Sequence, residues 1–268
     1  MRARLLTVAA TASLIAATTA CTSGPSVPTA VSSPAASAPS TSPSVSSAPS
    51  SVPMRITDPY SPAIVPSMFT TKVDNPYFPL TPGTRTVYEA ATADGRQRTT
   101  TEVTRDTKKI MGVDTVVVHD TVTIDDQPLE DTLDWYAQDR DGNVWYFGEA
   151  TKEFKDGGAD TAGSFEGGVN DALPGIIMPA HPQVGDQYRQ EYAKGVAEDT
   201  GEVLDLSGSE TTPLTGPAQG LLVTKDDNLL DPTSPSEKKY YARGIGLILT
   251  VQTAGPPERD QATAVETF

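Results

Sequence analysis

Two histidines and one cysteine are the residues of this chain that most readily act as bases, nucleophiles or metal ligands. His181 precedes a proline, which favours an extended backbone at the histidine. A hydrolase would need this ring within hydrogen-bond reach of a carboxylate such as Glu149 or Glu191. His119 lies on a threonine-rich strand face, where we expect a solvated or cross-strand role. An envelope hydrolase that uses His181 is therefore one alternative.

Other motifs of catalysis and cofactor binding are missing from the sequence. No Gly-x-Ser-x-Gly motif is present, and residues 163–167 match it only loosely. The glycines between positions 157 and 168 have neither the spacing nor the following helix of a phosphate- or dinucleotide-binding loop. No histidines or cysteines have the spacing of metal ligands. We expect no cofactor and no metal site.

Two acidic segments leave a cation-dependent module open as a second alternative. Asp139, Asp141 and Asn143 resemble the start of a calcium loop, but the remaining ligands are missing, and a hairpin turn explains the segment better. Five further acidic residues lie between positions 125 and 134 around a turn. Hard cations prefer such clustered oxygens, so a structural or adhesion role that depends on a cation stays open.

The charge of the chain excludes some partners. All 35 acidic residues lie in residues 54–268, with 18 of the 20 basic ones, so this part carries 18 − 35 = −17 charges. Nucleic acid and anionic lipid surfaces attract basic proteins, and they would repel this one. We expect no nucleic-acid partner.

Residues 1–20 have the pattern of an export signal. Arg2 and Arg4 precede a run of small and apolar residues that is short for a membrane span. The segment resembles a bacterial lipoprotein signal peptide, in which an aliphatic and two small residues precede the modified cysteine. Thr19, Ala20 and Cys21 fit, whereas Thr18 replaces the aliphatic residue. The resemblance implies that Cys21 carries lipid, palmitate included, and anchors the protein on the outer face of the cell membrane. Cleavage after Ala20 to release a soluble protein stays open.

Residues 21–53 would then form the lipidated cysteine and a stalk. Residues 22–53 are nearly all Ser, Pro, Ala, Thr and Val and carry no charge. This composition is typical of a disordered linker. Residues 54–268 have a length suited to one globular domain. With a single cysteine, that domain has no disulfide within the chain.

The sequence of the domain predicts an all-β, mostly antiparallel fold. Short runs rich in Val, Thr and Tyr alternate with turn dipeptides. We expect a curved meander sheet, half-barrel or sandwich, with one long Gly/Pro-rich insertion at residues 151–186. The predicted strands are 84–91, 98–105, 114–124, 129–138, 143–149, 187–192, 202–206, 221–225, 238–243 and 246–252.

Two strands have informative faces. In residues 114–124, Asp120 falls on the apolar face, where we expect a bulge or a polar partner. If Asp141 and Gly142 form a two-residue turn, Gln138 pairs with Trp145. Both faces of this hairpin are then aromatic and should be covered. One face carries Trp135, Val144 and Tyr146, and the other Tyr136, Trp145 and Phe147.

The insertion interrupts the β pattern. Residues 151–186 hold seven glycines and three prolines, and a connection of this length is often functional or else a disordered insertion. The apolar run at residues 176–178 favours a segment that packs across the sheet.

Several segments together resemble a group of secreted bacterial proteins without an established activity. The matching segments are Asn75–Leu80, Pro82–Thr84, Val87–Glu89, Asp134–Asp139, Gly142–Glu149 and Tyr240–Gly246. The order of these motifs is also similar to lipoprotein-carrier-like β half-barrels. That resemblance implies a curved sheet whose concave face holds acyl chains, although the covering helices of such carriers are not apparent.

These observations favour a non-enzymatic cell-surface lipoprotein over an enzyme. We expect it to bind an apolar or amphipathic ligand, or an envelope protein partner, on an aromatic concave face. The expected ligand-binding residues are Tyr136, Trp145, Phe147, His181 and Tyr188.

Overall fold

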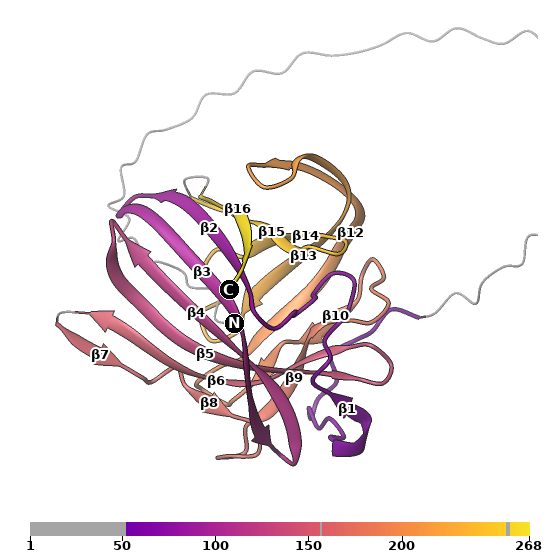
Figure 1. Ribbon diagram of the computed structural model, residues 1–268. Helices are drawn as coiled ribbons and strands as arrows, with labels where there is room; N and C mark the ends of the chain where they lie inside the picture. The colour runs from indigo at the N-terminus through magenta and orange to yellow at the C-terminus, as the bar shows by residue number, and fades with distance from the viewer. Residues whose placement is uncertain (1–51, 156, 256–257) are drawn as a thin grey trace, which may run out of the picture. The chain divides into compact units, whose positions relative to one another are not determined.

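Antiparallel β-strands make up nearly all of the regular structure, which confirms the predicted fold class. The computed structural model describes residues 52–155, 157–255 and 258–268. Within them, the one helical element is the single-turn 3₁₀ helix η1 (Pro66–Met68). No helix among the described residues has the length and apolar composition that a membrane span requires. The strands form one strongly curved, nearly closed sheet (Figure 1).

Five consecutive strands form the first meander. They are β2 (Thr84–Thr92), β3 (Gly95–Ile110), β4 (Val113–Ile124), β5 (Gln127–Asp139) and β6 (Val144–Lys155). Each pairs with the next, because the turns between them are very short. The β3–β4 turn places Met111 and Gly112 at φ of 49° and 81°, which is the left-handed geometry that a two-residue hairpin requires.

Five more strands form the second meander, which also follows chain order. They are β12 (Asp199–Thr212), β13 (Gly216–Asn228), β14 (Glu237–Ala242), β15 (Gly246–Gln252) and β16 (Arg259–Thr267). The sequence did not predict β16, which pairs with β15 on one side and β2 on the other. It therefore joins the two meanders into one sheet.

The far edges of the two meanders are linked by the chain itself. Strand β10 (Gln187–Arg189) pairs with β12, and β11 (Glu191–Tyr192) pairs with β9 (Leu173–Met178) beside β6. Only Gln190 separates β10 from β11, so the predicted single strand is divided between two edges. The backbones meet closely here, because a Cβ on Gly175 would lie 2.4 Å from the Gln190 carbonyl carbon.

The Gly/Pro-rich insertion extends the sheet instead of forming a separate loop. Strands β7 (Gly158–Asp160), β8 (Phe165–Glu166) and β9 all pair with β6. Ile177 and Met178 are buried in the main core, which confirms that this segment packs against the sheet.

The β5–β6 hairpin has a different register from the predicted one. The last backbone pair is Asp139 with Asn143, so Gln138 pairs with Val144 and not with Trp145. The turn has three residues, and the Asp139 carboxylate favours it by accepting hydrogen bonds from the Asn143 amide and the Trp145 indole. This carboxylate also accepts from the backbone of Asp141, so the calcium-like segment serves as a turn.

This register changes which aromatic residues share a face. Tyr136 and Tyr146 pair directly and lie in the main core on the concave side. Trp135, Trp145 and Phe147 lie on the other side in a second core cluster. Ile64 and Phe69 from the segment that includes η1 and β1 (Phe69–Thr70) cover this cluster, so both faces of the hairpin are covered as expected.

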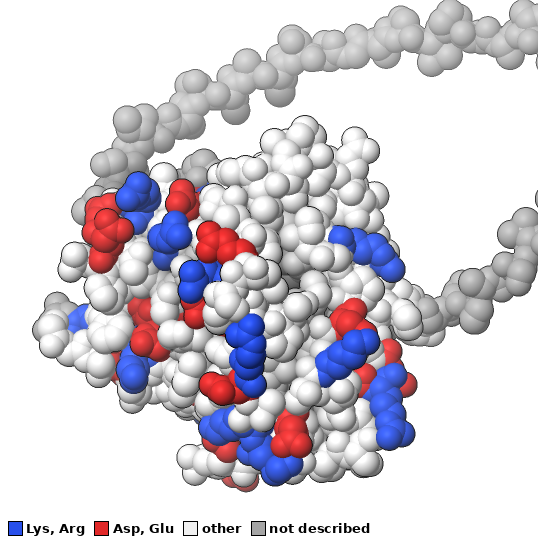
Figure 2. Space-filling view, in the orientation of Figure 1, with Lys and Arg blue, Asp and Glu red and all other residues white. Residues whose placement is uncertain are grey.

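Acidic and basic side chains are intermixed at the left and in the lower part of the face seen in Figure 2. Several form cross-strand pairs, such as Arg85 with Glu102 and Lys109 with Asp114. Exposed pairs of this kind contribute little to stability, about 0–1 kcal/mol each. The charges with larger consequences are those inside the sheet.

Candidate functional site

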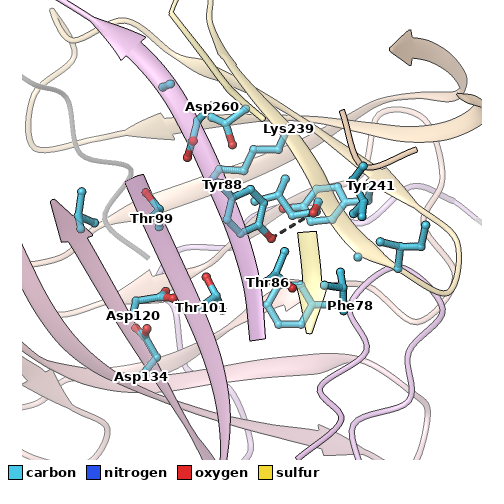
Figure 3. Close-up of a pocket in the computed structure, with 18 of the residues that line it drawn as sticks. Phe78, Thr86, Tyr88, Thr99, Thr101, Asp120, Asp134, Lys239, Tyr241 and Asp260 are labelled. Carbon is cyan, nitrogen blue, oxygen red and sulfur yellow. Dashed lines mark hydrogen bonds between the residues drawn. The ribbon is translucent and has the colours of Figure 1, made fainter. Parts of the chain in front are cut away.

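The concave side of the sheet encloses a cavity of about 710 Å³. A volume of this size lies within the range of small-molecule sites, roughly 300–1,000 Å³. Strands of both meanders contribute its walls, together with the loop at residues 78–81 and the β14–β15 turn (Figure 3). The cavity therefore exists only because β16 joins the two meanders.

Period-two alternation along the strands positions the lining. Every second residue of β2 and β3 points into the cavity, while the residues between them point outward. The lining residues from these two strands are Thr84, Thr86, Tyr88, Ala90, Thr92, Gln97, Thr99, Thr101 and Val103. Threonine hydroxyls and apolar side chains thus share the wall, which suits a ligand with polar and apolar parts.

Cross-strand register gathers a group of polar side chains on the wall formed by β3 to β6. Thr101 lies directly opposite Asp120, and Asp134 lies directly opposite Glu149. Because Asp120 pairs with Thr132, Asp134 is its diagonal neighbour on the same face. Figure 3 shows Asp120, Asp134 and Thr101 close together at the cavity wall.

Asp120 and Asp134 each have a carboxylate oxygen without a hydrogen-bond partner within the described protein. The side chains are 8% and 1% exposed, and the unpartnered atoms are Asp120 Oδ1 and Asp134 Oδ2. Burial raises the pKa of Asp120 to about 6, although hydrogen bonds with Thr101 and Asp134 oppose the shift. Burial and the nearby charge of Asp120 raise the pKa of Asp134 well above its usual value.

The hydroxyl group of Tyr146 on β6 holds the Asp134 carboxyl in position. The hydroxyl lies 2.6 Å from Asp134 Oδ1 and 3.0 Å from Glu149 Oε2. One hydroxyl carries one proton, so both contacts are hydrogen bonds when one of the two carboxyls is protonated. The raised pKa of Asp134 is consistent with a proton shared within this group.

A second group of charges lies on β13, β14 and β16 of the other meander. Lys239 Nζ is 2.7 Å from Asp226 Oδ2 and 3.8 Å from Glu237 Oε2, and all three side chains are buried. Burial alone would lower the pKa of Lys239, but the charges of Asp226 and Glu237 raise it. Burial raises the pKa of Glu237 to about 7 and that of Asp260 on β16 also to about 7.

The lining is strongly acidic. Its carboxyl side chains are Asp120, Glu130, Asp134, Glu149, Glu237, Glu258 and Asp260. Among the described lining residues, Lys239 is the one basic side chain, and it is already paired. Within the described residues, no three His, Cys, Asp or Glu side chains are arranged to hold a metal ion.

The residues that the sequence singled out for ligand binding do not line this cavity. Tyr136 packs between Phe78 and Tyr146 in the main core, on the same face of the sheet as the cavity but outside its lining. Trp145 and Phe147 pack on Phe69 at the opposite face of the sheet. The hairpin register accounts for the placement of Trp145 and Phe147, because a shift of one residue moves side chains to the other face.

Tyr188 and His181 are also outside the lining. Tyr188 packs in the main core against the backbone of Gly201, where a Cβ would lie 2.5 Å from its ring. His181 is exposed beside the β5–β6 turn, and no hydrogen bond or ion pair joins its ring to another described side chain. His119 on β4 faces Asp131 at 3.1 Å on the outer surface.

Two sequence signals could have located the cavity. One is Asp120, which interrupts the apolar face of its strand and is now seen to point into the cavity. The other is the alternation of threonines at positions 84, 86, 99 and 101 in two adjacent strands. In both cases, polar side chains occupy the face of a strand that points into the cavity.

Comparisons with known proteins give two similar folds. No family model matches the chain, and no curated protein matches its sequence. A Bacteroides fragilis protein classed as exported, with a YmcC-like fold, is 15% identical, with a TM-score of 0.42 over 71% of this chain and 99% of that one. A Parabacteroides distasonis protein classed as a lipoprotein is 12% identical, with a TM-score of 0.39 over 71% of this chain and 98% of that one. TM-scores below 0.5 leave the function to be argued from this chain's own residues.

Proposed function

We propose that this protein is an exported, lipid-anchored binding module that holds a small amphipathic ligand in its concave cavity. The export signal and Cys21 support the location. The observation that carries the binding role is a cavity of about 710 Å³ whose wall includes buried acceptor oxygens without partners in the described protein. Buried polar atoms without partners are rare in folded proteins, and a bound ligand is one way to satisfy them.

The lining supports an amphipathic ligand over a purely apolar one. Phe78, Leu80 and Leu247 offer apolar contacts, while the threonines and carboxyls need polar ones. A purely apolar ligand would leave the carboxyls desolvated without compensation, which costs several kcal/mol for each charge, by the order of magnitude seen for buried ions. A ligand with a polar end and an apolar body meets both requirements.

The proposal is tested by binding of an uncharged amphipathic dye, N-phenyl-1-naphthylamine, followed by its fluorescence. We expect saturable binding by the domain and at least a tenfold loss in Thr99→Phe, whose ring would occupy the cavity. Thr100→Phe is the matched control, because Thr100 is the next residue on β3 and does not line the cavity. Equal dye affinity in both variants, with both folded, would contradict the proposal.

A further inference from the structure

We propose that the ligand carries an ammonium group that binds against Asp120 and Asp134. This inference rests on the proposed function, since it names the chemistry of the ligand for the same cavity.

The unpartnered atoms define what the ligand must supply. Asp120 Oδ1 and Asp134 Oδ2 are acceptors on side chains that are more than nine-tenths buried and line the cavity. An ionised carboxylate only accepts hydrogen bonds, so its complement must donate them. An ammonium group offers several donors and can contact both carboxyls, which lie on adjacent strands and share one face.

The negative charge of the cavity favours an ammonium over uncharged groups that donate hydrogen bonds. Seven carboxyl side chains line it against one paired lysine. A hydroxyl can donate but leaves this charge uncompensated, and an anionic group would be repelled. Opposite charge within about 4–6 Å favours the ionised form of a carboxyl, so a bound cation offsets the cost of burial.

The groups that surround Asp120 give the direction of the pH dependence. They are Tyr88 on β2, Thr101 on β3, Glu130 and Asp134 on β5, Glu149 beside Asp134 on β6, and Asp260 on β16. None of the described groups in this set is a cation. A cation binds the ionised carboxyls, and Asp120 has a pKa of about 6 without ligand. Affinity for an ammonium should therefore fall as the pH is lowered through 6.

The apolar part of the ligand has a place near the cavity entrance. Ile245 and Val265 line the cavity and are 42% and 48% exposed, so they form an apolar rim. Leu247 lies deeper beside Tyr88, whose hydroxyl donates to the Leu247 carbonyl at 3.1 Å. A ligand whose alkyl or aromatic part packs along these side chains could still place its ammonium group against Asp120 and Asp134.

The test is displacement of the same dye by three compounds that share an eight-carbon chain and differ in their polar headgroup: octylammonium, 1-octanol and octanoate. At pH 7.5 we expect octylammonium to bind at least tenfold more tightly than 1-octanol, and octanoate to bind most weakly. At pH 5.5 the advantage of octylammonium should shrink severalfold. Octanol or octanoate binding as tightly as octylammonium would overturn the inference while leaving the cavity as a binding site.

Two variants sharpen the test. Asp120→Asn should remove most of the preference for octylammonium over 1-octanol, whereas Asp94→Asn should keep it. Asp94 is an exposed carboxyl in the β2–β3 turn and does not line the cavity, so the change in net charge is matched. If Asp120→Asn does not fold, the headgroup comparison on the unaltered protein still decides. If neither dye nor alkyl compounds bind that protein, the proposed function itself fails.

Discussion

Individual buried carboxyls should make this protein less stable as the pH rises from acidic to neutral values. Burial raises the pKa of Asp120 to about 6 and those of Glu237 and Asp260 to about 7. Each group then binds its proton more tightly in the folded state. The associated stability is present at low pH and is lost as the pH rises through 6 to 7.

We therefore predict a higher melting temperature at pH 5 than at pH 8. Asp120 alone contributes about 1.4 kcal/mol to this difference, because pH 5 lies about one unit below its folded-state pKa of about 6 and each unit is worth about 1.4 kcal/mol. The carboxyls whose pKa is lowered, such as Asp205 and Asp231, are exposed and act only at more acidic pH. Calorimetry across this range checks the prediction, and a melting temperature that rises from pH 5 to pH 8 would contradict it.

Asp120→Asn should raise the melting temperature at pH 8 and reduce its change between pH 5 and pH 8. The amide is uncharged, so it avoids the cost of a buried ion and can keep a contact with Thr101. Asp94→Asn should leave both values nearly unchanged, because Asp94 is exposed. Equal pH dependence in the two variants would show that Asp120 is not the group responsible.

Lys239→Met should destabilise the fold strongly at pH 8. Removing one partner of a buried ion pair leaves the others uncompensated, at a cost of about 3–5 kcal/mol. The loss should be smaller at pH 5, where Glu237 is protonated. Lys238→Met is the control, since Lys238 is the exposed neighbour on β14. Denaturant unfolding at both pH values measures the effect, and similar small losses in both variants would contradict the account.

At the scale of elements, a glycine bulge in β6 places Tyr146 and Glu149 against Asp134 of β5. Gly148 has φ of 127°, and a Cβ there would lie 2.3 Å from the Phe165 carbonyl oxygen. The bulge adds a residue to β6, so that both Tyr146 and Glu149 face Asp134. No residue other than glycine fits this position without moving β8.

Gly148→Ala should therefore cost about 2 kcal/mol or more, from the strained backbone and the contact with β8. Gly158→Ala on β7 is the control, because its nearest contact would be 3.7 Å away and its φ is not left-handed. Chemical denaturation of both variants decides the point. A loss in Gly148→Ala no larger than in Gly158→Ala would argue against a structural need for this glycine.

The sequence predicted the strands better than it predicted their pairing. Ten predicted segments coincide with strands, because alternation and turn residues are local signals. The β5–β6 register was wrong by one residue, because the Asp139 carboxylate favours a three-residue turn over the two-residue one. That shift is enough to move Trp145 and Phe147 away from the concave side, and the expected site with them.

Strand β16 was missed for a different reason. Its sequence, Arg259–Thr267, is mostly polar, with Ala262 as its one buried apolar residue. The strand forms because β15 and β2 offer backbone partners on both sides. Such pairing depends on the nearly closed sheet and has little local sequence signal, and without β16 the cavity could not be predicted.

At the scale of the whole molecule, β16 is the connection between the two meanders. Ala262 is fully buried and pairs with Tyr88 of β2. Ala262→Asp would place an unpaired charge there, and we expect loss of the cooperative unfolding transition. Val265→Asp on the same strand should be tolerated, since Val265 is 48% exposed. Circular dichroism during heating compares the two, and a folded Ala262→Asp variant would contradict this role.

The central claim is that the nearly closed sheet holds a ligand in its cavity. Native mass spectrometry of the protein purified at pH 7.5 from the cells that produce it tests this most directly, with Thr99→Phe and Thr100→Phe measured alongside. We predict an added small-molecule mass on the unaltered protein and on Thr100→Phe, lost on denaturation and absent from Thr99→Phe. A bare polypeptide mass for the unaltered protein, even after incubation with octylammonium, would contradict the account.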